Sequence, residues 1–179
     1  MKILATQGSH NLTGNTAALL DAWLAGAREA GHDVERIELA KLKLNPCLGC
    51  NRCRPDGKGT GQCVLKDDLP LNAVQECQVL VMASPVFWWN FNAVSRMFLE
   101  RLYCLPFNIW RGKKVKHIFT LNHPVPSMIS QNMPLTWNYM SSYLKFEYLE
   151  LLEGCSGQVP VSQQPDLLKM AHAQGLALQ

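Results

Sequence analysis

The sequence predicts an α/β protein, a three-layer αβα sandwich whose five-stranded parallel sheet has the strand order 2-1-3-4-5. Three observations predict this fold. Short apolar runs alternate with segments of helical periodicity along the chain. The run "QVLVMASP" is apolar almost throughout, as expected of a central parallel strand that is buried on both faces. A length of 179 residues with 47% hydrophobic content is enough for one core, so we expect a single domain over residues 1–179.

The first half of the chain predicts a strand, a helix and a second strand. The strands are "KILATQG" and "VERIEL". Between them, apolar residues recur at helical spacing up to the stop at Gly31: Leu19, Leu20, Trp23, Leu24, Ala27 and Ala30. Because strand, helix and strand follow one another, this segment predicts one βαβ unit.

The second half continues the alternation after the third strand, "QVLVMASP". A helical stripe follows at Val94, Met97, Phe98 and Leu102, and "KVKHIFTLN" predicts the fourth strand. Beyond it we expect a helix over 135–144, a fifth strand over 146–152 and a terminal helix from Pro165.

Charge and hydropathy exclude several classes of protein. The net charge of +3 is too small to indicate a nucleic-acid partner. No apolar run approaches the ~18 residues of a membrane span, and no leader pattern opens the sequence, so we expect a cytoplasmic protein. In that compartment the seven cysteines are expected to be thiols, metal ligands or redox groups and not a disulfide framework.

The stretch "QGSHNLTGNTAALLDAW", from Gln7 to Trp23, joins the first strand to the first helix. A loop in this position directs amide hydrogens and the positive end of the helix dipole at an anion. It lacks the lysine and the spacing of a triphosphate loop, and it also lacks the glycines of a dinucleotide loop. What remains is a single phosphate held by backbone amides and by polar side chains: Ser9, Thr13, Asn15 and Thr16. An ordinary helix cap with no ligand explains the same residues equally well.

Aromatic residues crowd the segment after the third strand. Pro85 directly follows the strand, and Phe87, Trp88, Trp89 and Phe91 precede the next helix. This is the carboxyl edge at which open α/β sheets bind ligands. Each ring by itself is explained as core or as a dimer contact. Together with a phosphate turn after the first strand, however, the segment predicts a phosphorylated isoalloxazine lying across this edge.

Four segments resemble a known family. They are "GSHNLTGNT", "PCLGCNRC", "CVLKDD" and "SPVFWWNFNAVSRMFLERL". In these segments the sequence resembles the flavodoxin-like NAD(P)H-dependent FMN reductases and their neighbours, the iron-sulfur flavoproteins. The resemblance implies a flavodoxin-like fold and an FMN-dependent oxidoreductase that passes electrons from NAD(P)H to a quinone, flavin or similar acceptor, or to a redox protein. It also implies a homodimer or tetramer, with Trp88, Trp89 and Phe91 near a second subunit.

The resemblance also assigns roles to residues. The first loop would bind the FMN phosphate and the Ser-Pro-Val loop would back the isoalloxazine, while the loop after the fourth strand would meet the pyrimidine edge. With the loop residues named above, the predicted cofactor-binding set is Ser9, Asn11, Thr13, Asn15, Thr16, Pro85, Val86, Phe87, Trp88 and Asn122. No catalytic residue is named, because the cofactor carries the hydride chemistry.

The sequence departs from the family pattern in both loops. His10 and Asn11 stand where the family commonly has proline and arginine, which removes a cation from the phosphate site. Phe87 lacks the usual tyrosine hydroxyl, and Trp89 replaces a glycine. These departures leave open a second reading, a redox sensor or binding module that has kept the fold and lost the flavin.

Four cysteines form a separate pattern. Cys47, Cys50 and Cys53 are spaced by two residues each, and Cys63 follows across the flexible stretch "RPDGKGTGQ". Four thiolates are the ligand set of a [4Fe-4S] cluster, and this spacing matches the start of the ferredoxin motif. Zinc and free thiols are the other two possibilities. With a cluster, the chain would be an iron-sulfur flavoprotein electron carrier.

Overall fold

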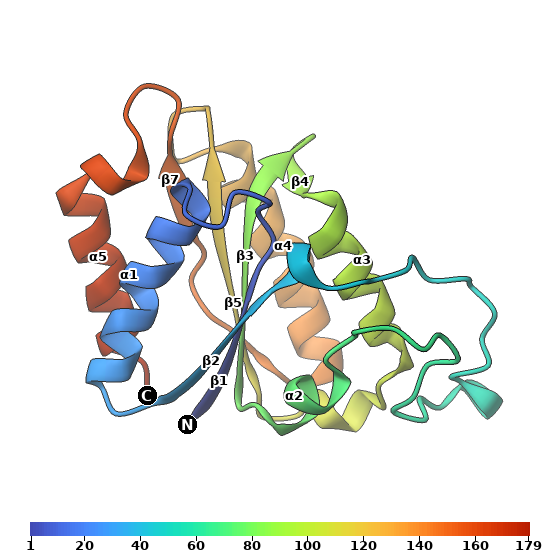
Figure 1. Cartoon of the computed structure of the whole chain (residues 1–179). Helices are drawn as coiled ribbons and strands as arrows, with labels where there is room; N and C mark the ends of the chain where they lie inside the picture. Colours follow the sequence, from blue (N-terminus) through green and yellow to red (C-terminus); the bar gives the residue numbers. More distant parts are fainter.

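A twisted parallel sheet separates two layers of helices (Figure 1). The computed structural model describes residues 1–179. The parallel strands are β1 (Lys2–Gln7), β2 (Asp33–Glu38), β3 (Val79–Phe87), β5 (Lys114–Leu121), β6 (Glu147–Tyr148) and β7 (Leu152–Cys155). They lie in the order β2-β1-β3-β5-β6, with β7 continuing beside β5. The predicted order 2-1-3-4-5 is therefore confirmed, with β6 and β7 together as the fifth strand.

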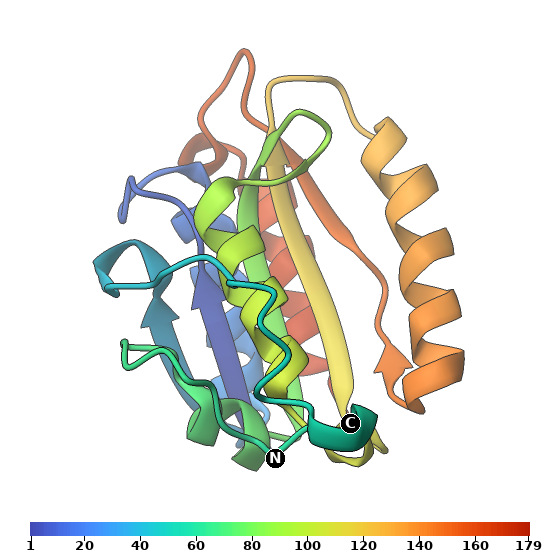
Figure 2. The ribbon, with the colours of Figure 1, turned by 90° about the vertical axis from the view of Figure 1, so that its right-hand side faces the viewer.

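Each face of the sheet is covered by its own helices (Figure 2) and has its own hydrophobic core. One face carries α1 (Asn15–Glu29) and α5 (Pro165–Leu176), and the other carries α2 (Leu71–Glu76), α3 (Ala93–Arg101) and α4 (Met128–Leu144). Alternate residues of β3 serve the two cores: Val79 and Val81 pack with α1, whereas Leu80 and Met82 pack on the α3 side. This explains why the third strand is apolar without alternation.

The close packing of α1 on α5 depends on Gly26 and Gly175. A Cβ at Gly26 would lie 2.0 Å from the His172 carbonyl oxygen, and one at Gly175 would lie 2.0 Å from the Trp23 carbonyl oxygen. No larger residue fits at this crossing. None of the helices has the length and apolar character needed to cross a membrane.

Several elements differ from the expectation. The fifth strand is interrupted over residues 149–151 and extends to Cys155. Within this interruption the Lys116 ammonium donates to the Glu150 carbonyl oxygen (2.5 Å). The helix expected over 135–144 begins earlier, at Met128, because Ser127 caps it by accepting from the Ile129 amide (3.0 Å). The periodicity of apolar residues alone could not place the start of this helix.

Short elements that the pattern did not predict are α2, the antiparallel strand β4 (Asn90–Phe91) and the 3₁₀ turns at 39–41, 55–57, 102–104, 107–110 and 161–163.

Candidate functional site

The loops after β1 and β3 meet at the carboxyl edge of the sheet. Between them lies an open cavity of about 850 Å³, which we call the edge cavity. Ser9, His10 and Asn11 line it from the first loop, and Pro85, Phe87 and Trp88 line it from the second. Arg96, on α3, is the one arginine or lysine in its wall. The volume is ample for a cofactor-sized ligand.

The amino end of α1 lies at the same edge of the sheet, directly after the first loop, although no residue of α1 lines the edge cavity (Figure 1). Its N-cap, Gly14, is extended (φ −82°, ψ −165°) and provides no side-chain cap. The amide hydrogens of the first helical turn have no partner within the helix, and the helix dipole adds positive potential there. An anion at this end would satisfy both. The ligand-free cap that the sequence left open as an alternative is not formed by any side chain.

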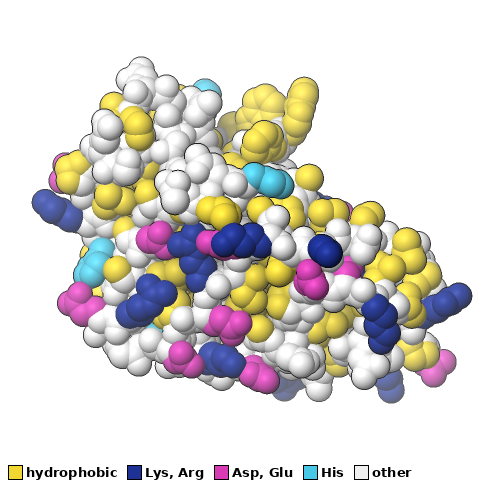
Figure 3. Space-filling model, in the orientation of Figure 1, with side chains coloured by type: hydrophobic (Ala, Val, Ile, Leu, Met, Phe, Trp, Pro, Cys, Tyr) yellow, Lys and Arg dark blue, Asp and Glu magenta, His cyan; other side chains and the backbone are white.

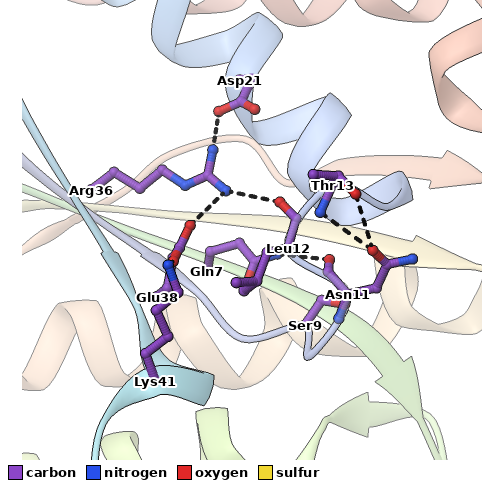
Figure 4. A network of polar contacts seen from close by, with 9 residues as sticks. All are labelled: Gln7, Ser9, Asn11, Leu12, Thr13, Asp21, Arg36, Glu38 and Lys41. Atoms are coloured by element: carbon purple, nitrogen blue, oxygen red, sulfur yellow. Dashed lines mark hydrogen bonds and ion pairs between the residues drawn. The ribbon is translucent and has the colours of Figure 1, made fainter.

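Short polar contacts fix the shape of the first loop. The Asn11 amide donates to Ser9 Oγ (3.1 Å), and the Thr13 amide donates to Asn11 Oδ1 (3.3 Å). From β2, the Arg36 guanidinium donates to the Leu12 carbonyl oxygen (3.4 Å) while pairing with Asp21 (Figure 4). Arg36 thus attaches the outside of the loop to the neighbouring strand and helix.

Asn92 joins the two loops, and sequence reasoning missed it. Its side-chain nitrogen donates to the Gly8 carbonyl oxygen (2.6 Å). Its Oδ1 accepts from Ser84 Oγ (3.2 Å) and from the Ser95 amide (3.3 Å), which makes it the N-cap of α3. Asparagine is a preferred cap, so its place directly before a predicted helix was a readable signal. The bond to Gly8 was not readable, because 84 residues separate the two.

The aromatic segment forms a tight hairpin. Val86 pairs with Phe91 and Phe87 with Asn90, so Trp88 and Trp89 are the two turn residues. Both have positive φ, 49° and 55°, as a type I′ turn requires. Tryptophan is costly in this conformation, and both side chains are exposed, Trp88 by 90% and Trp89 by 68%. Hydrophobic side chains accordingly project over this hairpin at the top of Figure 3.

The predicted cofactor residues divide into two groups. Those that line the edge cavity are Ser9, Asn11, Pro85, Phe87 and Trp88; those that do not are Thr13, Asn15, Thr16, Val86 and Asn122. In the second group several side chains bond to distant parts of the chain.

Three of these bonds define local structure. Thr16 Oγ1 lies 2.6 Å from Thr120 Oγ1, and Asn15 Oδ1 accepts from the Val161 amide (2.9 Å). Asn122 Oδ1 accepts from Ser156 Oγ (3.2 Å). The hydroxyl of Thr16 and the side-chain oxygen of Asn15 therefore already have hydrogen-bond partners within the protein. The backbone amides of both residues lie in the first turn of α1, where no helical partner exists.

The donor set is chemically suited to FMN. Uncapped first-turn amides and neutral polar side chains suit a phosphate, and exposed aromatic side chains suit a planar ring. Beneath the first loop, Ser95 Oγ and Gln7 Oε1 are buried and have no hydrogen-bond partner. Unpaired buried polar groups are uncommon in folded proteins, and a water or a ligand that reaches them is one explanation for each. The residues present therefore fit the cofactor.

A fully buried histidine lies behind the hairpin. His117, on β5, packs edge-on against Phe91 (5.0 Å between ring centroids) and Trp137 (4.2 Å), and its Nδ1 lies 3.0 Å from the Tyr148 hydroxyl. Burial, reinforced by the Lys116 charge, lowers the pKa of His117 to about 3. The imidazole is therefore neutral at physiological pH.

The cysteine segment is anchored by Arg54. Its guanidinium donates to the carbonyl oxygens of Tyr103 (2.7 Å), Gly57 (3.0 Å) and Leu105 (3.0 Å) and lies over the Phe107 ring. These contacts hold the loop against the end of α3. In this conformation, no group of three or more histidine, cysteine or carboxylate side chains is arranged to hold a metal ion.

The four cysteines of the pattern are placed differently from one another. Cys47 and Cys50 are exposed, whereas Cys53 and Cys63 are half-buried. A fifth cysteine, Cys104, is buried near the second pair: burial and the neighbouring thiolates of Cys63 and Cys53 raise the pKa of its thiol to about 11. The spacing of the other four cysteines gave no signal that Cys104 lies beside Cys53 and Cys63.

The parallel sheet with helices on both faces defines a flavodoxin-like fold, and the first loop and the aromatic hairpin line its edge cavity. The chain belongs to the NADPH-dependent FMN reductase family, whose model matches residues 1–123. Among characterised proteins it is similar to an iron-sulfur flavoprotein of Methanocaldococcus jannaschii (35% identity over 103 residues, 56% of this chain and 51% of that protein). It is also similar to one of Archaeoglobus fulgidus (33% over 104 residues, 57% and 46%). The matches thus span about half the length of these relatives.

Solved structures agree on the fold. Smu.1420 from Streptococcus mutans superposes with a TM-score of 0.77 at 19% identity, covering 99% of this chain and 100% of the other. An NAD(P)H:quinone oxidoreductase from Methanothermobacter marburgensis gives a TM-score of 0.70 at 16% identity, covering 100% and 99%. At these identities the likeness establishes the architecture alone.

Proposed function

We propose that the chain is an FMN-dependent oxidoreductase that takes electrons from NAD(P)H and passes them to a quinone, flavin or similar small acceptor. One observation carries the proposal: the first loop, which leads into the uncapped amino end of α1, and the aromatic hairpin line one edge cavity, and Asn92 bonds Gly8 of that first loop. FMN, when bound, supplies the hydride chemistry, and the protein supplies binding, orientation and exclusion of water.

Different residues of the chain would bind the phosphate and the ring of FMN. The first-turn amides of α1, with Ser9 and Asn11, would bind the phosphate, while Phe87 and Trp88 would cover the ring. His117 is neutral, so it adds no competing charge behind the hairpin.

We also propose that the protein acts as a homodimer or higher oligomer. The 17 residues of α4 include no charged residue. Leu135, Tyr139 and Tyr143, spaced by four residues, form an exposed stripe along it, and the exposed Trp89 lies beside its amino end. An uncharged apolar surface of this kind is typical of a subunit interface. Phe91 is not part of it, because it is buried within the protomer.

The proposal is tested by titrating the purified, flavin-free protein with FMN and with riboflavin, which lacks the phosphate. Ser9→Asp keeps an oxygen acceptor for the Asn11 amide but sets a carboxylate beside the phosphate site. We expect it to weaken FMN at least about tenfold and to leave riboflavin unchanged. Ser9→Asn is the matched neutral control. Colourless protein that fails to bind FMN would refute the proposal and favour the flavin-free redox sensor.

A second candidate is an iron-sulfur flavoprotein electron carrier. Two observations favour it: relatives with this name match the chain, and Arg54 anchors the loop that carries Cys47, Cys50, Cys53 and Cys63. Anaerobic purification with iron, sulfide, zinc and flavin measured on one sample separates the candidates. About four irons per chain, lost in Cys53→Ser and kept in the control Cys77→Ser, would support the cluster. Flavin without metal would support the simple reductase.

A further inference from the structure

A second cavity lies on the other side of the aromatic hairpin. It measures about 420 Å³ and is enclosed by the hairpin, α3 and α4; we call it the inter-helix cavity. Its apolar wall consists mainly of Trp89, Phe91, Met133, Trp137 and Met140. The cavity is separate from the edge cavity but adjacent to it, since both are lined by Asn90, Phe91 and Arg96.

The lining of the inter-helix cavity favours a flat ring. Aromatic side chains stack on planar ligands, and methionine side chains adapt to them through flexible, polarisable thioethers. Trp137 is held rigidly from behind by His117 and by Tyr148, whose ring stacks on it at 6.0 Å. The cavity therefore combines a fixed aromatic wall with the deformable wall formed by Met133 and Met140.

Arg96 is the only charged residue in this lining. Its nearest carboxylate, Glu100, lies 3.7 Å away on the same exposed helix face. Such a pair contributes little and leaves the guanidinium free to bind another anion. The other polar groups of the wall, Asn90, Asn132 and Thr136, are neutral. The cavity thus has one cationic side chain in an otherwise apolar and neutral lining.

We propose that the inter-helix cavity binds the electron acceptor, a flat aromatic or quinonoid ring that carries an acidic substituent, and that Arg96 selects for that substituent. The inference rests on the proposed function and specifies its substrate class. Overall, NAD(P)H, one proton and the quinone give NAD(P)⁺ and the hydroquinone. Two electrons and one proton leave the nicotinamide as hydride, and the second proton comes from solvent.

The test is calorimetric titration with 1,4-naphthoquinone-2-sulfonate and with neutral 1,4-naphthoquinone, on both flavin-free and FMN-loaded protein. We expect the sulfonate to bind at least about fivefold more tightly than the neutral ring. In Arg96→Gln this preference should disappear. Thr136→Phe fills the cavity from α4 without touching the edge cavity, and should abolish binding of both probes. Gln131 is exposed on the same helix outside both cavities, so Gln131→Phe is the matched control and should bind as the wild type does.

Equal affinity of the two probes, or unchanged binding in Thr136→Phe, would overturn the inference. So would displacement of the sulfonate by FMN, because the probe would then occupy the edge cavity. FMN affinity, measured on the same proteins, keeps the two proposals apart. Wild-type protein that binds FMN but no quinone refutes this inference alone, whereas failure to bind FMN refutes the proposed function.

Discussion

Replacing Asn92 by alanine tests whether one side chain holds the two loops of the edge cavity together. The side chain is 94% buried, being 6% exposed, and it makes three hydrogen bonds. Losing the helix cap at Ser95 costs about 1 kcal/mol. Leaving the Gly8 carbonyl oxygen without its donor adds about 1–3 kcal/mol. We therefore expect Asn92→Ala to lower the free energy of unfolding by about 2–4 kcal/mol.

The assay is urea unfolding of the flavin-free protein, followed by circular dichroism, with FMN affinity measured separately. Asn92→Ser separates the two terms, because serine is a good cap but has no nitrogen to donate to Gly8. It should recover about 1 kcal/mol relative to alanine. Both variants should weaken FMN, by about tenfold or more, since the loops that would hold its phosphate and its ring are no longer fixed to each other.

Two results would refute the reasoning. A loss of less than about 1 kcal/mol in Asn92→Ala would mean that the bond to Gly8 contributes nothing beyond the cap. The expected loss of about 2–4 kcal/mol together with unchanged FMN affinity would mean that the loops are positioned independently of Asn92.

Three further predictions concern buried or strained groups. The pKa of His117 is about 3 in the folded protein and about 6.5 in the unfolded chain, so the unfolded state binds more protons below pH 6.5. The free energy of unfolding should therefore fall by up to about 1.4 kcal/mol for each unit of decreasing pH. Urea unfolding between pH 4 and 7 should show a weaker dependence of stability on pH in His117→Gln than in the wild type. Arg101→Met leaves the buried Asp67 carboxylate unpaired and should cost about 3–5 kcal/mol, most of it recovered when Asp67→Leu is added. In the wild type the pair holds the pKa of Asp67 at about 2, so its contribution is complete above about pH 4 and is lost as pH falls toward 2. The double variant Trp88→Asn, Trp89→Gly removes two tryptophans held at positive φ and should raise the free energy of unfolding by about 1–2 kcal/mol. It should also weaken the binding of FMN. A lower free energy of unfolding would show that the turn is not strained.

The sequence by itself determined the sheet and its order. Apolar runs and helical periodicity are local patterns, and they report which residues must be buried. "QVLVMASP" predicted a strand covered on both faces, and β3 indeed contributes to both cores. The glycine- and hydroxyl-rich loop was also readable, because its place between a strand and a helix fixes the direction of its amides.

Only the tertiary structure decided which side chains face the cavity. Thr16 looked like a phosphate ligand, but its hydroxyl meets Thr120, 104 residues away. The sequence assigned no role to Asn92, but its side chain donates to the Gly8 carbonyl oxygen of the first loop. Arg96 joins the walls of two cavities, although nothing in its neighbourhood in the sequence marks it. Such pairings depend on how distant segments pack against each other, and a local pattern of residues contains no information about that packing.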